Sequence, residues 1–251
     1  MSAYTEKDLF SRTELLLGPE IMQKISGTRV IIFGIGGVGS WCAESLVRSG
    51  IRHLTIVDAD DISASNVNRQ LMATSANIGQ NKVDVMRERL LGINPGAEII
   101  ALNMVYTAET AAEFDLDAYD YVLDCIDSLK DKQTLILNAS ASSAIFFSSM
   151  GSALKVDPMQ IKVASFWKVR GCPLGSMLRK RLRQKGTLPA KDFLCVYDEE
   201  VLPNKGSAPS QEEDPGLFKK AQVNGTLAHI TGIFGLTLAG LVIKDIYKQY
   251  E

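Results

Sequence analysis

The sequence predicts an α/β fold in which a doubly wound, mainly parallel sheet has helices on both faces and a C-terminal extension. Two observations predict this class. Short runs of β-branched and aromatic residues alternate with segments of helical composition through about the first 150 residues. The first of these runs leads directly into a glycine-rich turn and then into a helical segment, which is the Rossmann-like βα unit.

The expected elements follow from this alternation in chain order. Residues 5–26 carry apolar side chains at helical spacing, and Gly18-Pro19 interrupts the run. Strands that alternate with helices form parallel sheets, because a helix must carry the chain back to the edge where the strand began. The expected strands are 29–33, 51–58, 98–104, 119–126 and 145–149, and the expected helices between them are 40–49, 82–91 and 135–141.

We expect a single domain over residues 1–251, made of three parts. The nucleotide-binding core spans about 10–155, a basic and loop-rich region spans about 156–220, and a C-terminal core helix spans about 224–249. Within the second part, 168–185 and the polar stretch 202–216, which contains Pro and Gly, are expected to be surface excursions.

Composition narrows the class of protein. The chain has 46% hydrophobic and 22% charged residues, which is ordinary for a soluble globular protein. Its net charge of −2 gives no global attraction for a polyanion, so any nucleic-acid surface must be a local patch. The four cysteines form no C-x-x-C pair, which argues against a zinc ribbon and a disulfide scaffold. The amino-terminal residues lack the apolar run of a signal peptide, and we expect a cytoplasmic protein.

Residues 226–243 form an apolar stretch without formal charge, close to the length that spans a membrane. Three glycines, Gly232, Gly235 and Gly240, lie within it, and neither a basic cluster nor an aromatic belt flanks it. We therefore expect a buried core helix, not a membrane span, and no stable membrane partner.

The glycine turn predicts a nucleotide site. It runs from Gly34 to Gly39, where glycines allow a ligand close to the backbone and the N–H groups at the helix start face its phosphates. Asp58 ends the second strand nineteen positions after Gly39, in a position to accept hydrogen bonds from ribose hydroxyls. These features suit NAD, FAD and ATP alike, and taken alone they favour an NAD-dependent oxidoreductase.

The segment that follows favours ATP. Asn66, Arg69 and Lys82 are suited to the oxygens of a triphosphate, which a dehydrogenase cofactor lacks. Asp124 and Asp127 end the fourth strand, at the edge where such folds bind ligands, and a carboxylate there can hold Mg²⁺ against the phosphates. The structural alternatives are plain surface positions for Arg69 and Lys82, and a helix N-cap for Asp127.

Together these residues resemble the ubiquitin-activating-type adenylating enzymes, a family that includes the MoeB and ThiF proteins. The shared motifs are G-x-G-G-x-G-S at 34–40, D-x-D at 58–60, S-N-x-x-R-Q at 65–70, the lysine at 82, and D-C-x-D at 124–127. They form a specific ordered set that covers roughly residues 10–155. The resemblance implies ATP and Mg²⁺ as cofactors, together with a monovalent cation, Na⁺ or K⁺, near the active site.

The resemblance also assigns roles to residues of this chain. Arg12 matches the arginine that such enzymes insert into the ATP site of the neighbouring subunit, which implies a homodimer. The implied catalytic residues are Arg12, Arg69, Lys82 and Asp127, with Asp127 as the metal ligand. The implied nucleotide-binding residues are Gly34, Gly36, Gly37, Gly39, Asp58, Asp60, Asn66, Arg69, Gln70, Lys82 and Asp127.

Within that family the chain is similar to the dehydratases that act on threonylcarbamoyladenosine in tRNA. It lacks the zinc-binding C-x-x-C pairs of MoeB and ThiF, and both the stretch from Cys172 and the apolar ending at 242–245 resemble this branch. The branch implies that ATP adenylates the carboxylate of the threonylcarbamoyl group. AMP then leaves as the group closes into a ring.

A basic segment supports a tRNA substrate from the residues themselves. No acidic residue lies between 158 and 191 to offset its charges, and such a cluster suits contacts to phosphates. The alternative is a solvated helix face. Phe166 and Trp167 are expected to be packing residues in preference to base-stacking ones. The expected tRNA-binding residues are Lys168, Arg170, Arg179, Lys180, Arg181, Arg183 and Lys185.

Other functions remain open at this stage. The chain could instead activate the C-terminus of a ubiquitin-like sulfur-carrier protein, bind NAD as an oxidoreductase, or sense a nucleotide without turnover. A cysteine-desulfurase or sulfur-acceptor partner is also left open. Cys172, in the basic segment, is the candidate nucleophile for a thioester, although the tRNA-modifying reaction needs none. Cys42 and Cys125 are expected to be packing residues.

Overall fold

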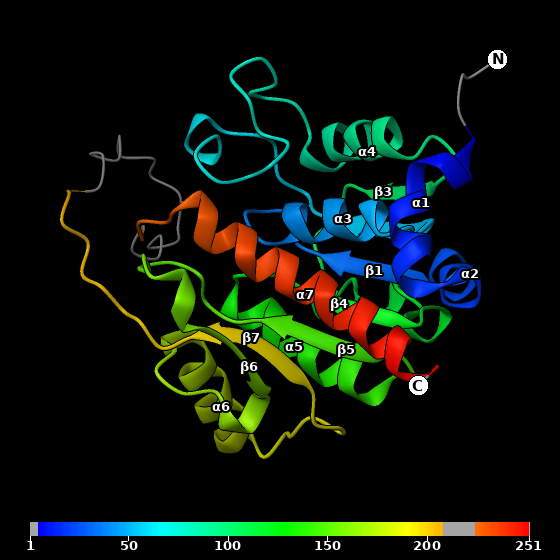
Figure 1. Ribbon diagram of the computed structural model, residues 1–251. Coiled ribbons are helices and arrows are strands. Elements are labelled where there is room, and N and C mark those ends of the chain that lie inside the picture. The colour runs from blue at the N-terminus through cyan, green and yellow to red at the C-terminus, as the bar shows by residue number, and fades with distance from the viewer. Residues whose placement is uncertain (1–4, 208–223, 251) are drawn as a thin grey trace.

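The computed structural model describes residues 5–207 and 224–250, and seven strands in these ranges form one sheet (Figure 1). The strand order is β3-β2-β1-β4-β5-β7-β6, and all neighbours are parallel except the edge pair β7 and β6, which is antiparallel. This confirms the predicted Rossmann-like class. The strands are β1 (Arg29–Phe33), β2 (His53–Val57), β3 (Glu98–Leu102), β4 (Tyr121–Asp124), β5 (Ile145–Ser149), β6 (Ile161–Ser165) and β7 (Leu194–Asp198).

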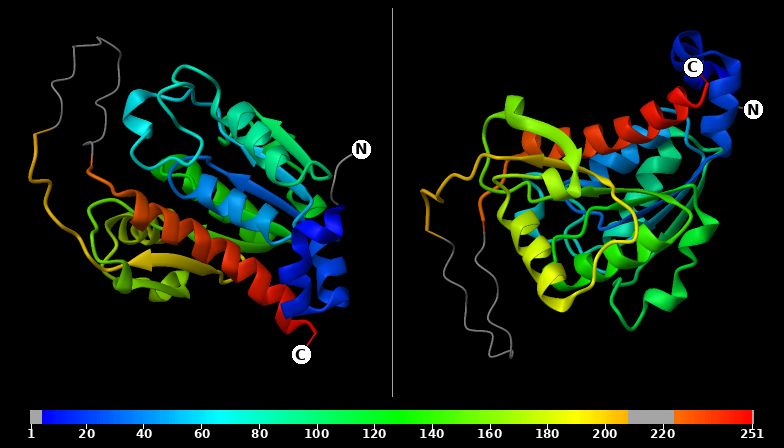
Figure 2. Two further views of the ribbon diagram at one scale, coloured as in Figure 1. Left: turned by 45° about the horizontal axis from the view of Figure 1, so that its top comes forward. Right: turned by 90° about the horizontal axis from the view of Figure 1, so that it is seen from below.

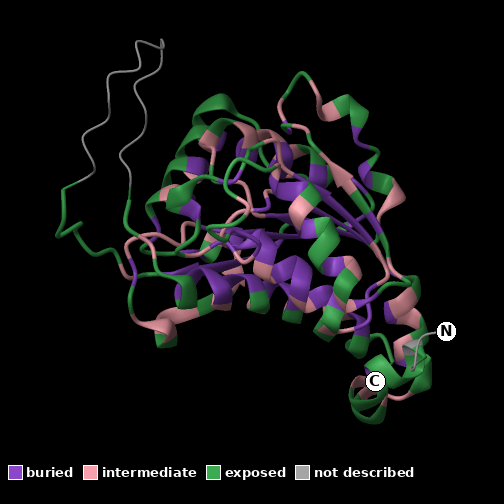
Figure 3. Ribbon diagram, turned by 90° about the horizontal axis from the view of Figure 1, so that it is seen from above, coloured by how far each residue is buried: buried purple, intermediate pink, exposed green. Residues whose placement is uncertain are grey.

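Helices cover both faces of the sheet because alternate side chains of each central strand point to opposite faces. In β1, Val30 and Ile32 belong to one apolar cluster, whereas Ile31 and Phe33 belong to the other. Figure 3 shows the buried residues gathered on the sheet and on the inner faces of the helices. The first cluster contains residues of α2 (Pro19–Gly27), α3 (Gly39–Arg48), α4 (Lys82–Ile93) and α7 (Ala228–Lys248); the second contains residues of α5 (Leu129–Ala141) and α6 (Pro173–Lys185).

The remaining elements lie around this frame. Helix α1 (Glu6–Leu17) starts at a capping box, in which the Thr5 hydroxyl and the Asp8 carboxylate each accept from the other's backbone N–H. It contacts α2 at the amino-terminal end of β1, and the C-terminal end of α7 lies beside both helices (Figure 2). Short 3₁₀ turns are η1 (Ala64–Asn66), η2 (Ala111–Glu113), η3 (Leu116–Ala118), η4 (Pro158–Gln160) and η5 (Phe166–Lys168).

Helices α3 and α7 pack tightly against each other beside the glycine turn. A Cβ added to Gly235 would overlap the carbonyl oxygen of Val38 and lie 2.9 Å from the backbone nitrogen of Cys42. The two helices can meet at this distance only because residue 235 has no side chain. Gly240, one turn and a half farther along α7, is exposed and faces open space.

Helix α7 is long and apolar enough to cross a membrane by length and composition, and half of its most apolar stretch is buried inside the protein. The buried residues include Phe234, Leu238 and Val242, which are fully enclosed. They belong to the same cluster as the apolar face of α3. This packing supports the predicted core helix.

The expectation for residues beyond 155 was wrong in part. Residues 168–185 are not a surface excursion: α6 packs Leu178 and Leu182, both fully buried, against the sheet. The strands β6 and β7 were also not predicted, although the apolar run of β7 is a buried-strand pattern. Of the expected loop 202–216, residues 208–216 lie outside the described residues. The division into one domain with three parts stays a prediction.

Two alanine substitutions in α7 test the close contact at its middle. Gly235→Ala forces Cβ into the backbone of α3, and we expect it to reduce the free energy of unfolding by about 1–3 kcal/mol. The matched control, Gly240→Ala, adds the same group in open space and should increase it by about 0.5–1 kcal/mol through helix propensity. Urea unfolding of both variants measures the difference; equal effects would contradict the packing described.

Candidate active site

The carboxyl ends of the central strands meet at one edge of the sheet. The register aligns Phe33 with Val57 and with Asp124, and Asp124 with Ser148. The residues that directly follow these strands are therefore neighbours, and they include the glycine turn and Asp58. Parallel α/β sheets bind ligands at this edge, where the connections to the helices diverge.

Two glycines of the turn are required by the fold itself. Gly34 has φ +89°, and a Cβ there would lie 2.8 Å from the carbonyl oxygen of Cys125. A Cβ on Gly39 would overlap the carbonyl oxygen of Gly34, so the two ends of the turn touch. Gly37 is also confined, since its Cβ would lie 3.2 Å from the side chain of Thr231 in α7.

Gly36 differs from these three glycines. It has no positive φ, and the nearest atom to an added Cβ would be the Gln70 side-chain nitrogen at 3.8 Å, an ordinary contact. Nothing within the described chain therefore requires glycine at this position. The adjoining helix α3 has Val38 at its N-cap and no side-chain cap, and of its first N–H groups that of Ser40 is bonded to the Gly36 carbonyl. An uncapped helix start of this kind attracts an anion. The absence of a side chain at Gly36 therefore leaves room for a ligand to approach the backbone here.

Asp58 connects the turn to the next strand. Its carboxylate accepts from the N–H of Ile35 at 2.6 Å and from the N–H of Asp60 at 2.9 Å. Burial raises the pKa of Asp58 above its usual value, and the nearby Lys82 ammonium and these two hydrogen bonds oppose that effect. The predicted role at a ribose stays a prediction, but the side chain lies beside the turn as expected.

Lys82 is buried at the first position of α4, so a plain surface position for it is wrong. Its Nζ donates to Asp60 at 2.6 Å and lies 3.7 Å from Asp58. An ammonium group has three hydrogens, so this pairing leaves one for a further anion. The structure thus brings together three of the predicted site residues, Asp58, Asp60 and Lys82.

The loop between β2 and α4 carries the next predicted residues. Asn66 is buried and closes η1, where its side-chain oxygen accepts from the N–H of Ser63 at 3.1 Å. The Arg69 guanidinium is partly exposed and donates to the Ser65 carbonyl at 2.9 Å. Gln70 is buried with its side-chain amide toward Gly36, and its Oε1 finds no partner among the described residues. The amide nitrogen that faces Gly36 could donate to a ligand bound there, and the unpaired Oε1 could accept from a ligand's N–H or O–H group.

A buried ion pair that sequence reasoning missed lies at the end of β4. Lys132 Nζ lies 2.8 Å from Asp124, and both side chains are fully enclosed. Asp124 also accepts from Ser148 at 2.7 Å. Burial raises the pKa of Asp124, with Lys132 opposing. The pair also bonds to both backbone polar groups of Ile126: Asp124 accepts from its N–H, and Lys132 donates to its carbonyl.

Asp127 follows directly on this fixed residue and is exposed. The N-cap of α5 is Ser128, whose hydroxyl accepts from the N–H of Asp131, so the alternative that Asp127 caps the helix is wrong. No group of three or more metal-ligating side chains occurs within residues 5–207 and 224–250. A single carboxylate such as Asp127 is nevertheless what Mg²⁺ uses when phosphates and water supply its other ligands.

Arg12 lies outside this edge. It is exposed on α1, and α1 lies at the amino-terminal end of β1, opposite the glycine turn (Figure 1). Within one chain, Arg12 therefore does not join the other predicted site residues. Arg12 could act at this edge only from a second subunit.

The basic segment runs from η5 through the connection that carries Arg170 into α6, and η5 directly follows the edge strand β6. Six of its seven cationic residues are exposed, and Arg179 is partly buried. Cys172 is 1% exposed and forms the N-cap of α6, where its sulfur accepts from the Gly175 N–H. Its burial does not suit a nucleophile. Cys42 and Cys125 pack beside the turn as predicted.

The fold and this site define a nucleotide-binding protein of the doubly wound α/β class. The ThiF family model matches residues 10–250, so the chain belongs to the ThiF family. It is 35% identical to the tRNA threonylcarbamoyladenosine dehydratase of Bacillus subtilis (strain 168), over 96% of this chain and 96% of that protein. It is 37% identical to the protein of the same name from Haemophilus influenzae, over 93% of this chain and 91% of that one.

A solved structure is similar over the full length. The crystal structure of E. coli tRNA N6-threonylcarbamoyladenosine dehydratase, TcdA, in complex with ATP matches with a TM-score of 0.85 and 29% sequence identity. The match covers 99% of this chain and 98% of that one. The C-terminal helix and the basic helix are therefore parts of a shared architecture and not additions to it.

Gly36→Ala tests whether the phosphates of ATP lie against the turn at Gly36. Because the added methyl makes only ordinary contacts, we expect the unfolding midpoint to stay within about 2 °C of the original, as for an effect below about 0.5 kcal/mol. Affinity for ATP, measured by calorimetry, should fall at least about tenfold because the methyl fills the phosphate position.

Gly92→Ala in α4 serves as the control, since it also adds a methyl group in open space but lies away from the turn. It should leave ATP affinity unchanged. Unchanged affinity in Gly36→Ala as well would remove the phosphate assignment.

Proposed function

We propose that this protein uses ATP to dehydrate N6-threonylcarbamoyladenosine in tRNA, with release of AMP and pyrophosphate. The observation that carries the proposal is the glycine turn, which leaves room for a ligand against Gly36, in a chain that aligns end to end with dehydratases of that name. The ATP-bound relative supports the choice of nucleotide. We also propose a cytoplasmic location, where tRNA and ATP are both available.

The chemistry proceeds in two steps. A carboxylate oxygen of the threonylcarbamoyl group attacks the α-phosphorus of ATP, and pyrophosphate leaves with the electrons of the broken P–O bond. The side chain then closes on the activated carbonyl carbon, and AMP leaves as a proton is released, for a net loss of one water. AMP is needed because hydroxide is a poor leaving group, so the protein's task is alignment and charge neutralisation.

The site residues fit this task. The N–H groups at the start of α3 would face the phosphates over Gly36, and Arg69 and Lys82 would neutralise their charge. Lys82 keeps Asp58 and Asp60 as partners and has one ammonium hydrogen left for a phosphate oxygen. Asp127 would hold Mg²⁺, which when bound withdraws charge from the phosphate oxygens.

The homodimer is part of the proposal. Two leucines of α1, Leu15 and Leu16, are 84% and 81% exposed, and a face of this kind suits a subunit contact. Arg12 lies on the same helix and would enter the partner's ATP site. The Arg12 guanidinium would then neutralise phosphate charge only in the dimer, since in a single subunit it lies away from the ATP site.

The proposal also includes a monovalent cation, Na⁺ or K⁺, bound near the active site. Asp198 at the end of β7 is fully buried, and the Lys155 ammonium lies 3.9 Å from its Oδ1. Its Oδ2 finds no partner within the described part of the chain and is the one oxygen that it could offer to such a cation. The second candidate function is activation of a ubiquitin-like sulfur carrier, for which family membership is the supporting observation. Docking of a cysteine-desulfurase system would accompany either function.

The first test is a nucleoside analysis. Incubation with ATP, Mg²⁺ and tRNA that carries the threonylcarbamoyl group should give a nucleoside lighter by one water, detected by mass spectrometry, only when ATP is present. An unchanged nucleoside, with AMP formed instead on addition of a carrier protein that ends in Gly-Gly, would establish the second candidate and refute the first.

The second test mixes two inactive variants. Arg12→Ala and Lys82→Ala should each abolish turnover, because each removes a cation from the triphosphate site. After random re-pairing, the mixed dimer has one intact site built from Lys82 of one chain and Arg12 of the other, so about one quarter of the original activity should return. No recovery, with dimerisation confirmed by light scattering, would show that Arg12 does not act across subunits.

A further inference from the structure

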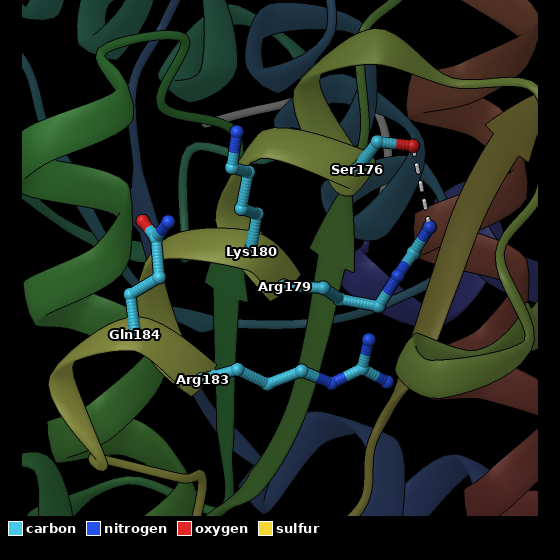
Figure 4. Close-up of a pocket in the computed structure, with 5 residues that line it drawn as sticks. All are labelled: Ser176, Arg179, Lys180, Arg183 and Gln184. Atoms are coloured by element: carbon cyan, nitrogen blue, oxygen red, sulfur yellow. Dashed lines mark hydrogen bonds between the residues drawn. The ribbon is translucent and has the colours of Figure 1, made fainter.

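A shallow depression on α6 gathers several cationic side chains on one face of the helix (Figure 4). Its volume is about 390 Å³. Its five residues stand at positions i, i+3, i+4, i+7 and i+8, which share one side of a helix. They are Ser176, Arg179, Lys180, Arg183 and Gln184, named here the α6 basic face.

The α6 basic face lies opposite the buried face of the helix. Leu178 and Leu182 are fully buried against the sheet, whereas Lys180, Arg183 and Gln184 are exposed. Arg181 and Lys185, also exposed, do not line the depression. The seven basic residues singled out from the sequence are therefore not equivalent.

Arg179 is held by the protein. Its guanidinium donates to the Phe166 carbonyl at 3.1 Å and lies 5.9 Å from the centre of the Phe166 ring. Burial lowers the pKa of Arg179 from its usual value. These contacts make Arg179 a positioning residue that fixes α6 against η5 and so fixes its neighbours in the depression.

Arg183 forms a stacked surface with Trp167. Its guanidinium lies 5.0 Å from the centre of the Trp167 ring, and Figure 4 shows it extending to the same side of α6 as Arg179. Trp167 is packed edge-on against Phe166 but stays partly exposed. A guanidinium plane supported by an indole is a preorganised donor for phosphate oxygens and a platform for an unstacked base.

The start of α6 lies at the edge of the sheet that carries the candidate active site. Cβ atoms built on Gly151 and Gly175 would lie 3.7 Å from Cys172 Sγ and 3.4 Å from Met150 Sδ, respectively. Met150 and Gly151 directly follow β5, whose neighbour β4 leads into Asp127. The depression therefore begins about one turn of helix from that edge.

We propose that the α6 basic face binds the backbone of the tRNA next to the modified adenosine, with Lys180 and Arg183 on phosphates and one unpaired base on the Arg183–Trp167 stack. This rests on the proposed function and names the part of the chain that holds its substrate. An anionic membrane would be attracted by charge alone, whereas the fixed guanidiniums and the indole favour RNA.

The test compares three double variants that each remove two positive charges from the full-length protein. Lys180→Gln/Arg183→Gln should weaken binding of the modified tRNA at least about tenfold, measured by fluorescence anisotropy, and reduce the salt slope by about 1.4 for two contacts to an unpaired strand. Arg181→Gln/Lys185→Gln should lose clearly less. Lys244→Gln/Lys248→Gln, at the exposed C-terminal end of α7, is the charge-matched control and should change affinity less than twofold.

Equal losses in the first two variants, or no loss in the first, would overturn the proposal. So would loss of binding to phosphatidylserine vesicles in Lys180→Gln/Arg183→Gln with tRNA affinity intact. Binding of an unpaired oligonucleotide should also quench Trp167 emission, a signal absent in Trp167→Phe, and an unquenched Trp167 would exclude stacking. These outcomes are distinct from a failure of the proposed function. In that case the unaltered protein would form no dehydrated nucleoside, whatever the variants show in the binding measurements.

Turnover separates binding from chemistry. At saturating tRNA, Lys180→Gln/Arg183→Gln should keep kcat within about twofold and raise KM, because phosphate contacts away from the reacting carboxylate contribute uniform binding. A fall in kcat with KM unchanged would place these residues in the chemical step and overturn the proposal.

Discussion

The hydrogen bond from the Ile35 N–H to the Asp58 carboxylate is the contact on which the site depends. It ties the glycine turn after β1 to the end of β2, and it does so with a carboxylate that is mostly out of water. Such a carboxylate needs a counter-charge, which Lys82 supplies from the first turn of α4. Asp60 joins the same lysine and holds the loop that leads toward Arg69. One acceptor therefore fixes the relative positions of a strand end, a turn and a helix start.

The same arrangement recurs on the other side of β1. Asp124 ends β4 as Asp58 follows β2, and Lys132 on the helix after β4 pairs with it. In both places a lysine from the start of a helix compensates an acidic strand end. The difference lies in the partner: Lys132 and Asp124 are both wholly enclosed and hold the backbone before Asp127, whereas Lys82 pairs with Asp60, whose carboxylate is exposed. A buried pair of this kind contributes little net stability. It nevertheless fixes the position of the strand end relative to the helix, because separating the partners would leave each buried charge uncompensated.

Sequence patterns located the glycine turn, the first five strands and most of the polar residues around the turn, because these signals are local. They did not reveal Lys132, which lies in a charged stretch that has the composition of a solvated helix surface. Its partner Asp124 accepts from Ser148 of β5, and Lys132 also lies near Cys195 of β7, so its surroundings come from later in the chain. Nor did they separate Arg179 from Arg183, since one bonds to a backbone carbonyl and the other stacks on an indole only in the folded state. The edge strand β6 escaped detection because its half-exposed side chains give no clear alternation.

The pairing of α7 with α3 has a consequence for how the protein is made. The two helices are separated by about 180 residues in the chain, yet Gly235 and Thr231 of α7 complete the packing around the start of α3. During synthesis the apolar side of α3 therefore emerges long before α7, which covers it in the folded protein. The nascent protein must keep that surface from other partners until α7 arrives, and α7 itself is a segment that membrane-targeting factors could bind.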